Sequence, residues 1–103
     1  MVKRLSLPDI LIFDWGAGNL EHIKKHNVGY NECEEAFYNL PFLAIFDKEH
    51  SNRENRYQAL GQTNKGRLLF VSYTLRDEKI RVISARDQNS KEKRSYISGG
   101  DKV

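Results

Sequence analysis

The sequence is poor in cysteine and shows no metal-binding pattern. Its single cysteine, Cys33, excludes an intramolecular disulfide and favours a reducing, cytoplasmic environment. A lone cysteine without a CxxC partner gives poor support for a zinc site. His22 and His26 are four residues apart, but no third ligand follows at helical spacing. We therefore expect no metal site.

Long apolar runs and phosphate-binding glycine loops are also lacking. No stretch approaches the roughly 20 apolar residues of a membrane-spanning helix, and residues 1–5 lack the apolar stretch of a secretory signal. Gly16 and Gly18 are not followed by a third glycine at the dinucleotide-binding spacing, and no GK[ST] motif occurs. These absences predict a protein that has no membrane partner and uses no cofactor.

The residues that are present suit a small soluble domain with a basic second half. With 39% apolar and 30% charged residues, a chain of 103 residues can bury one modest core. Residues 1–60 carry 7 Lys/Arg against 9 Asp/Glu, whereas residues 61–103 carry 10 against 5. This imbalance suits contact with a polyanion, and equally fits an incidental surface excess. We expect one domain over residues 1–103, frayed at 1–8 and 98–103.

Helical periodicity predicts three helices, at residues 19–27, 31–40 and 91–97. Asn31 and Glu34 have the spacing of a capping box at the start of the second helix. Its apolar residues at helical spacing predict a buried face formed by Cys33, Ala36, Phe37 and Leu40. The first helix should end near Asn27, which tolerates the left-handed conformation, and Pro41 should end the second. Ser90 can cap the third helix, and Gly99-Gly100 should end it.

Five strands are predicted, at residues 9–15, 42–46, 56–60, 66–74 and 79–86, with 42–46 fully buried. The last three should form an antiparallel meander. The element order is then strand, two helices, four strands and a helix. This order predicts a small α+β domain, in which an antiparallel sheet is combined with two N-terminal helices and one C-terminal helix.

The short turns of the meander predict its register. With Asp77-Glu78 in one turn, Thr74 faces Arg81 and Leu75 faces Ile80. With residues 64–66 as the other loop and Gly66 left-handed, Arg56 faces Thr74. Gln58 then faces Ser72 on the same side of the sheet. The opposite side is predicted to face the core with Leu69, Val71, Tyr73, Leu75, Ile80 and Val82.

The row formed by Arg56, Thr74 and Arg81 is the best candidate site. Two guanidinium groups on an open sheet face can bracket a phosphate with fixed, forked donors. In phosphodiester cleavage they would stabilise the charge that develops on the pentacoordinate phosphorus. The alternative is an ion-paired surface with Glu54 or Glu92 as the partner.

Two histidines could transfer protons. His26 ends the first predicted helix, where it could act as an acid or base or simply cap the helix. His50 stands beside Ser51 in a polar loop, and the sequence offers no evidence that the two form a catalytic pair. Two non-enzymatic interpretations stay open: a module that binds RNA or protein through the same basic face, and a structural subunit with an apolar groove and no converging cations.

Several motifs between residues 13 and 97 form a distinctive combination. They are Trp15, Lys25-His26-x-Val28, Glu35-Ala36-Phe37, His50-Ser51-x-x-Glu54-x-Arg56, Gly61, Gly66-Arg67-Leu68-Leu69, Tyr73-Thr74-x-Arg76, the segment from Ile80 to Arg86, and Glu92-x-Arg94-x-Tyr96. Together these motifs resemble the BrnT family, the toxin half of BrnT/BrnA toxin–antitoxin pairs. The sequence departs from the family pattern around the first helix, at Gly16, Asn19, His22 and Asn27.

This resemblance implies a RelE-like fold and a metal-independent endoribonuclease. A base would deprotonate a ribose 2′-OH, which attacks the adjacent phosphate. The implied partners are an RNA substrate and a BrnA-like antitoxin with a ribbon-helix-helix DNA-binding end, and oligomers would form only with that antitoxin. The predicted catalytic residues are Arg56, Arg81, His26 and Glu54. The predicted substrate-binding residues are Lys25, Thr74, Arg67, Arg76 and Arg86.

Overall fold

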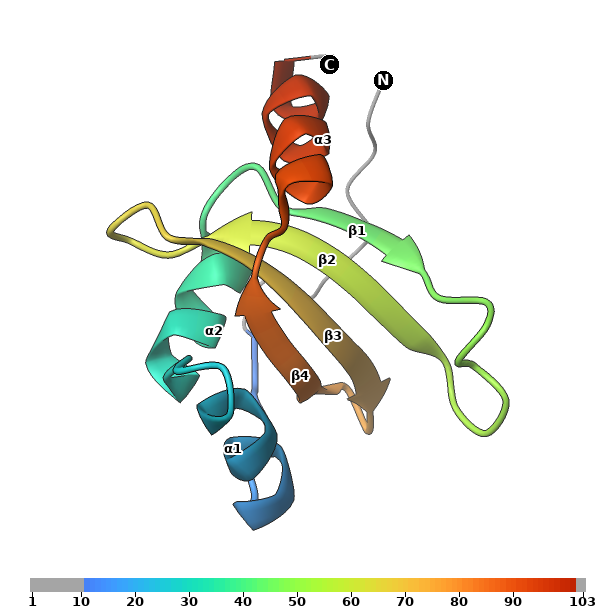
Figure 1. The fold of residues 1–103 in the computed structure, drawn as a ribbon. Helices are drawn as coiled ribbons and strands as arrows, with labels where there is room; N and C mark the ends of the chain where they lie inside the picture. Colours follow the sequence, from blue (N-terminus) through green and yellow to red (C-terminus); the bar gives the residue numbers. More distant parts are fainter. Residues whose placement is uncertain (1–10, 102–103) are drawn as a thin grey trace.

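The computed structural model describes residues 11–101, which form three helices and one four-stranded antiparallel sheet with strand order β1-β2-β3-β4 (Figure 1). This arrangement confirms the predicted α+β class. The elements are α1 (Ala17–Lys24), α2 (Tyr30–Tyr38), β1 (Leu43–Phe46), β2 (Arg56–Gln62), β3 (Leu68–Arg76), β4 (Lys79–Asp87) and α3 (Ser90–Asp101). Within residues 11–101 no helix combines the length and the apolar character needed to cross a membrane.

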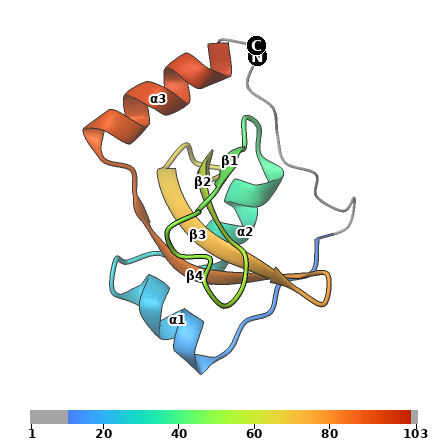
Figure 2. The ribbon, with the colours of Figure 1, turned by 90° about the vertical axis from the view of Figure 1, so that its right-hand side faces the viewer.

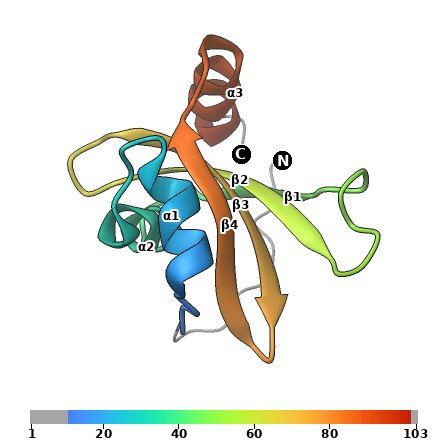
Figure 3. The ribbon, with the colours of Figure 1, turned by 60° about the horizontal axis from the view of Figure 1, so that its bottom comes forward.

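The helices lie on different sides of the sheet. In Figures 1 and 3, α1 and α2 lie on one side of the sheet, and α3 lies away from them, past the opposite side. The close approach of α2 is visible at Gly61 of β2, where an added Cβ would lie 2.9 Å from the carbonyl oxygen of Ala36. In Figure 2, α3 extends away from the end of β4, so it covers little of the sheet face opposite α1 and α2.

The core lies between α2 and the sheet. Phe37 of α2 packs edge-on against Tyr73 of β3, with ring centroids 5.0 Å apart. Five of the six predicted core residues on the sheet are buried. The exception is Leu75, which is 40% exposed beside the turn. The buried five are Leu69, Val71, Tyr73, Ile80 and Val82.

The predicted register is confirmed. Thr74 pairs with Arg81 on one side and with Arg56 on the other, and Gln58 pairs with Ser72. Gly66 has a φ of 84°, as the predicted hairpin loop requires. The register between β3 and β4 shifts between Ser72 and Tyr73. Tyr73 pairs with Val82 and Ser72 pairs with Ser84, so Ile83 of β4 has no partner on β3.

The N-terminal predictions need correction. Of the strand predicted at 9–15, residues 9 and 10 lie outside the described residues, and Phe13 forms only an isolated parallel bridge to Ile80. The helix α1 begins at Ala17 rather than Asn19, because the Asn19 side chain accepts a hydrogen bond from the backbone N–H of Gly16 at 2.6 Å. The helix ends at Lys24, before the predicted end near His26-Asn27, although Asn27 has the predicted left-handed conformation, with a φ of 57°.

The second helix and the strand after it also differ from prediction. The N-cap of α2 is Gly29, whose N–H donates to Glu32 at 3.0 Å, so the helix begins before the predicted Asn31–Glu34 box. Leu40 follows the end of α2 and is 66% exposed. The β1 strand was predicted to be buried, but it lies at the sheet edge and exposes Ile45 and Phe46.

The last helix has a different cap and a later end. Asn89, not Ser90, precedes α3 and exchanges hydrogen bonds with Glu92: the Glu92 N–H donates to the Asn89 side chain at 2.8 Å, and the Asn89 N–H donates to the Glu92 carboxylate at 2.9 Å. The helix then continues through Gly99-Gly100 to Asp101. The two glycines therefore do not end the helix.

Candidate functional site

The register of β2, β3 and β4 brings Arg56, Thr74 and Arg81 into one row on the sheet face opposite the core. In the described part of the chain, the Arg56 guanidinium makes neither a hydrogen bond nor an ion pair. Within residues 11–101, Arg81 has an ion-pair contact with Asp14 alone, at 3.6 Å, and both of these side chains are more than a third exposed. An exposed pair of this kind contributes about 0–1 kcal/mol. Both guanidinium groups are therefore available to an anionic ligand.

The middle residue of the row has a structural contact instead. Thr74 is completely buried, and its hydroxyl donates a hydrogen bond to the backbone carbonyl of Asn55 at 2.6 Å. The sequence predicts that this hydroxyl contacts the substrate, whereas in this structure the group is covered and its proton is engaged with the Asn55 carbonyl. Thr74 instead fixes the chain just before Arg56.

Glu54 lies within the electrostatic field of three arginines. Arg76 donates a hydrogen bond to its carboxylate at 2.7 Å. That bond is the main cause that lowers the pKa of Glu54; partial desolvation acts the other way, and the charges of Arg76, Arg56 and Arg81 add to the lowering. A carboxylate with a lowered pKa stays ionised and accepts protons less readily. Glu54 is thus better suited to holding arginines than to proton transfer.

A pocket of about 660 Å³ adjoins the Arg56 end of the row, between the loop after β1 and the ends of β2 and β3. Three arginines from two parts of the chain converge there, together with a histidine and two carboxylates. Such a cluster of forked donors suits a phosphate or another polyanion. The residues lining the pocket are Glu49, His50, Asn52, Arg53, Glu54, Arg56 and Arg76.

A buried carboxylate orients the histidine of this pocket. Asp47 is only 8% exposed, and its carboxylate lies 2.9 Å from Nδ1 of His50 and accepts a hydrogen bond from Nε2 of Gln58 at 3.1 Å. Desolvation favours a higher pKa for Asp47, but the hydrogen bonds from His50 and Gln58 prevail and lower it. The His50 side chain itself is 60% exposed.

The neighbouring Ser51 does not complete a Ser-His pair. Its hydroxyl donates to the backbone carbonyl of Asp47 and accepts the backbone N–H of Arg56 at 3.0 Å. The serine therefore joins the loop to β2. The sequence analysis identified His50 but not its partner, Asp47. The Asp-x-x-His spacing could have indicated this contact, although it forms only when the loop turns back on itself.

Residues 15–92 match the family model of BrnT, the ribonuclease toxin of type II toxin–antitoxin systems. The chain belongs to the BrnT family. The match includes the arginine row and the pocket, and it confirms the resemblance inferred from the motifs. Family membership supports a role as a ribonuclease toxin and implies an antitoxin partner. No curated protein matches the chain.

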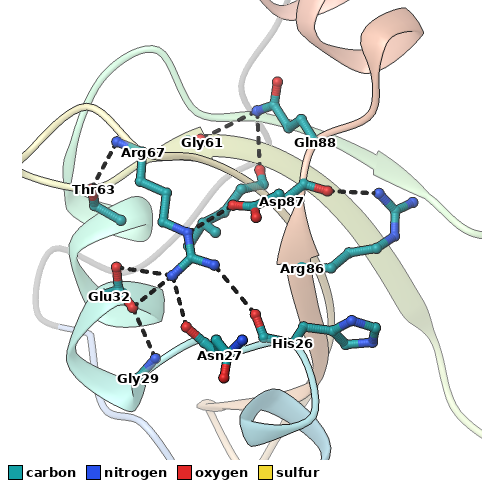
Figure 4. Close-up of polar contacts among 11 residues, drawn as sticks. His26, Asn27, Gly29, Glu32, Gly61, Thr63, Arg67, Arg86, Asp87 and Gln88 are labelled. Carbon is teal, nitrogen blue, oxygen red and sulfur yellow. Dashed lines mark hydrogen bonds and ion pairs between the residues drawn. The ribbon is translucent and has the colours of Figure 1, made fainter.

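In this BrnT toxin, His26 lies far from the arginine row. Its backbone carbonyl accepts a hydrogen bond from Arg67, which also contacts Asp87 at the end of β4 (Figure 4). Arg81 lies six residues earlier on the same strand, or about 20 Å away at the usual strand rise. The structure therefore does not bring His26, or its neighbour Lys25, together with the arginine row.

Arg67 and Arg86 were predicted to bind substrate, but both have partners within the toxin (Figure 4). Arg67 donates to Asp87 at 2.7 Å, to Glu32 at 3.1 Å and to two backbone carbonyls in the turn after α1. Arg86 donates two hydrogen bonds to Glu92, at 2.8 and 3.0 Å, and lies 4.2 Å from the centre of the Phe70 ring. These contacts join the helices to the sheet.

Two further features bear on the alternatives considered for this toxin. An apolar groove of about 570 Å³ lies between the sheet and α3, lined partly by Leu43, Ile45, Leu60 and Phe70. The cations converge as well, so the groove does not favour a purely structural subunit. Among residues 11–101, no group of three His, Cys, Asp or Glu side chains is arranged to hold a metal ion.

Proposed function

We propose that this BrnT toxin is an endoribonuclease that needs no metal ion and holds the scissile phosphate between Arg56 and Arg81. The observation that carries the proposal is the position of these two guanidinium groups on β2 and β4, the strands on either side of β3, where Arg81 has only a weak, exposed pair with Asp14 among the described residues. Arg76 is bound to Glu54 and would contribute positive charge rather than a direct contact.

The proposed reaction begins with loss of the proton from a ribose 2′-OH. The 2′-oxygen attacks the adjacent phosphorus, the bond from phosphorus to the 5′-oxygen breaks, and a 2′,3′-cyclic phosphate forms. Negative charge accumulates on the non-bridging oxygens of the pentacoordinate phosphorus. Two guanidinium groups already positioned there stabilise that charge more than they stabilise the ground state.

The test measures cleavage of total RNA, alone and in a translation extract, by Arg56→Ala and Arg81→Ala variants. Each variant should cleave about 100- to 1000-fold more slowly, which is the usual effect of removing one preorganised donor to a transition-state charge. Lys24→Ala, which removes an exposed cation from α1, is the matched control and should cleave normally. If Arg56→Ala and Arg81→Ala fold and cleave at the normal rate, the site is wrong.

We also propose that the antitoxin implied by the family carries a ribbon-helix-helix DNA-binding end, so that neutralisation and gene regulation reside in one partner. The purified toxin–antitoxin complex should bind operator DNA and leave RNA intact. A complex that cleaves RNA as fast as the free toxin would refute neutralisation by direct binding.

A further inference from the structure

We propose that His50, oriented by Asp47, is the general base that removes the proton from the ribose 2′-OH. This inference rests on the proposed ribonuclease function and assigns the step that the arginines cannot perform, because guanidinium groups stay protonated in proteins. It also replaces His26, which lies at the other end of β4.

The contact with Asp47 orients the imidazole of His50. An ionised carboxylate only accepts hydrogen bonds, so the contact between Asp47 and Nδ1 of His50 places the ring proton on Nδ1. Nε2 then carries the lone pair, which is the form a general base needs. The contact is well supported, because Asp47 also accepts the backbone N–H of His50 at 3.3 Å and the side chain of Gln58.

Residues of β2 and the loop before it connect this histidine to the phosphate-binding Arg56. Gln58, which holds Asp47, is two residues from Arg56 on β2, so their side chains lie on the same sheet face. Ser51, next to His50, accepts the backbone N–H of Arg56. His50 and Arg56 also line one pocket. The base and the phosphate donor are thus held by the same strand.

Proton transfer to His50 accompanies cleavage of the phosphodiester bond. The 2′-OH proton moves to Nε2 of His50, the bond from the 2′-oxygen to phosphorus forms, and the bond from phosphorus to the 5′-oxygen breaks. The 5′-oxygen takes a proton from water, and the imidazolium later returns its proton to solvent. Asp47 stabilises the imidazolium as it forms, as carboxylates do in catalytic triads.

Charges of both signs surround His50. The carboxylates of Glu49 and Glu54 line the pocket together with the guanidinium groups of three arginines. Asp47 is the carboxylate in direct contact with the ring. The three arginines are Arg53, Arg56 and Arg76.

The experiment compares His50→Gln with His22→Gln, a control that removes an exposed histidine whose ring has a hydrogen-bond contact with the carbonyl of Ile83 on β4. We expect His50→Gln to lower kcat about 100- to 10,000-fold, with RNA binding changed by less than about threefold. His50→Ala should regain activity when imidazole is added. Asp47→Asn should also lose kcat, because an amide N–H facing Nδ1 moves the ring proton to Nε2, and added imidazole should not restore it.

Each outcome decides one claim. A folded His50→Gln variant that cleaves at the wild-type rate overturns the assignment of the base, while the ribonuclease function stands. Loss of activity in His50→Ala that imidazole does not restore also overturns it, because that result indicates a structural role. If the wild-type protein and His22→Gln both fail to cleave RNA, the proposed function itself is wrong.

Discussion

Replacing Arg67 with methionine should destabilise the fold without removing a substrate contact. The side chain is 27% exposed and joins β3 to Asp87, to Glu32 and to the turn between α1 and α2. Hydrogen bonds to charged groups contribute about 1.5–3 kcal/mol where they are shielded, whereas an exposed pair contributes about 0–1 kcal/mol. Because Asp87 is largely exposed and Glu32 is not, we expect a total loss of roughly 2–3 kcal/mol.

Thermal and urea unfolding monitored by circular dichroism measure this loss. In a domain of this size it should lower Tm by roughly 10–20 °C. The control is Lys65→Met, which removes an exposed cation two residues away and should change stability by less than about 0.5 kcal/mol. If Arg67→Met loses under 1 kcal/mol, on the order of a single exposed pair, the network does not stabilise the fold as we argue.

The stability difference should also depend on pH. The hydrogen bond from Arg67 lowers the pKa of Asp87 in the folded state. A carboxyl group with a lowered folded-state pKa stabilises the fold above its unfolded pKa, and this contribution disappears as pH falls through the folded pKa. The difference in free energy of unfolding between wild type and Arg67→Met should therefore be largest at neutral pH and should decrease below about pH 4. A gap that widens in acid would contradict the reasoning.

The same variant separates a structural role from substrate binding. Well below its Tm, Arg67→Met should cleave RNA within a few-fold of the wild-type rate. A large loss of cleavage with unchanged stability would restore the original prediction that Arg67 contacts the substrate.

Two glycine substitutions should change stability in opposite directions. Gly61→Ala places a Cβ 2.9 Å from the backbone carbonyl oxygen of Ala36 and should cost about 1–3 kcal/mol by forcing α2 away from β2; unchanged stability in urea unfolding would argue against this close contact. Gly18→Ala lies in α1 with open space around the new Cβ and should stabilise the protein by about 0.5–1 kcal/mol; a lower Tm would contradict the helix assignment there.

The sheet was predictable from sequence because its turns are short. Asp77 and Glu78 both have positive φ values, of 53° and 65°, so a two-residue turn fixes the pairing of Thr74 with Arg81. The hairpin loop that ends at Gly66 fixes the next pairing in the same way. Once the register is fixed, strand alternation determines which side chains share a face.

The details that sequence reasoning missed depend on distant partners. Gly29 caps α2 with no side chain of its own, because Glu32 reaches back to its N–H. The carboxylate that Arg67 contacts on α2 lies 35 residues earlier in the chain, so no local pattern distinguishes this arginine from the uncommitted Arg56. The contact between Asp47 and His50 arises from the path of an irregular loop, which periodicity does not describe.

The most direct test of the central claim is the chemistry of the cut RNA ends in excess chelator. The toxin should cleave an oligoribonucleotide and leave a 2′,3′-cyclic phosphate on one fragment and a 5′-hydroxyl on the other. A matched oligonucleotide with a 2′-deoxy sugar at the mapped cleavage position should stay intact. The Arg81→Ala variant should cleave the all-ribose oligonucleotide much more slowly than the wild-type toxin does. Cleavage that requires a divalent ion, or that proceeds at the deoxy position, would contradict the proposed mechanism.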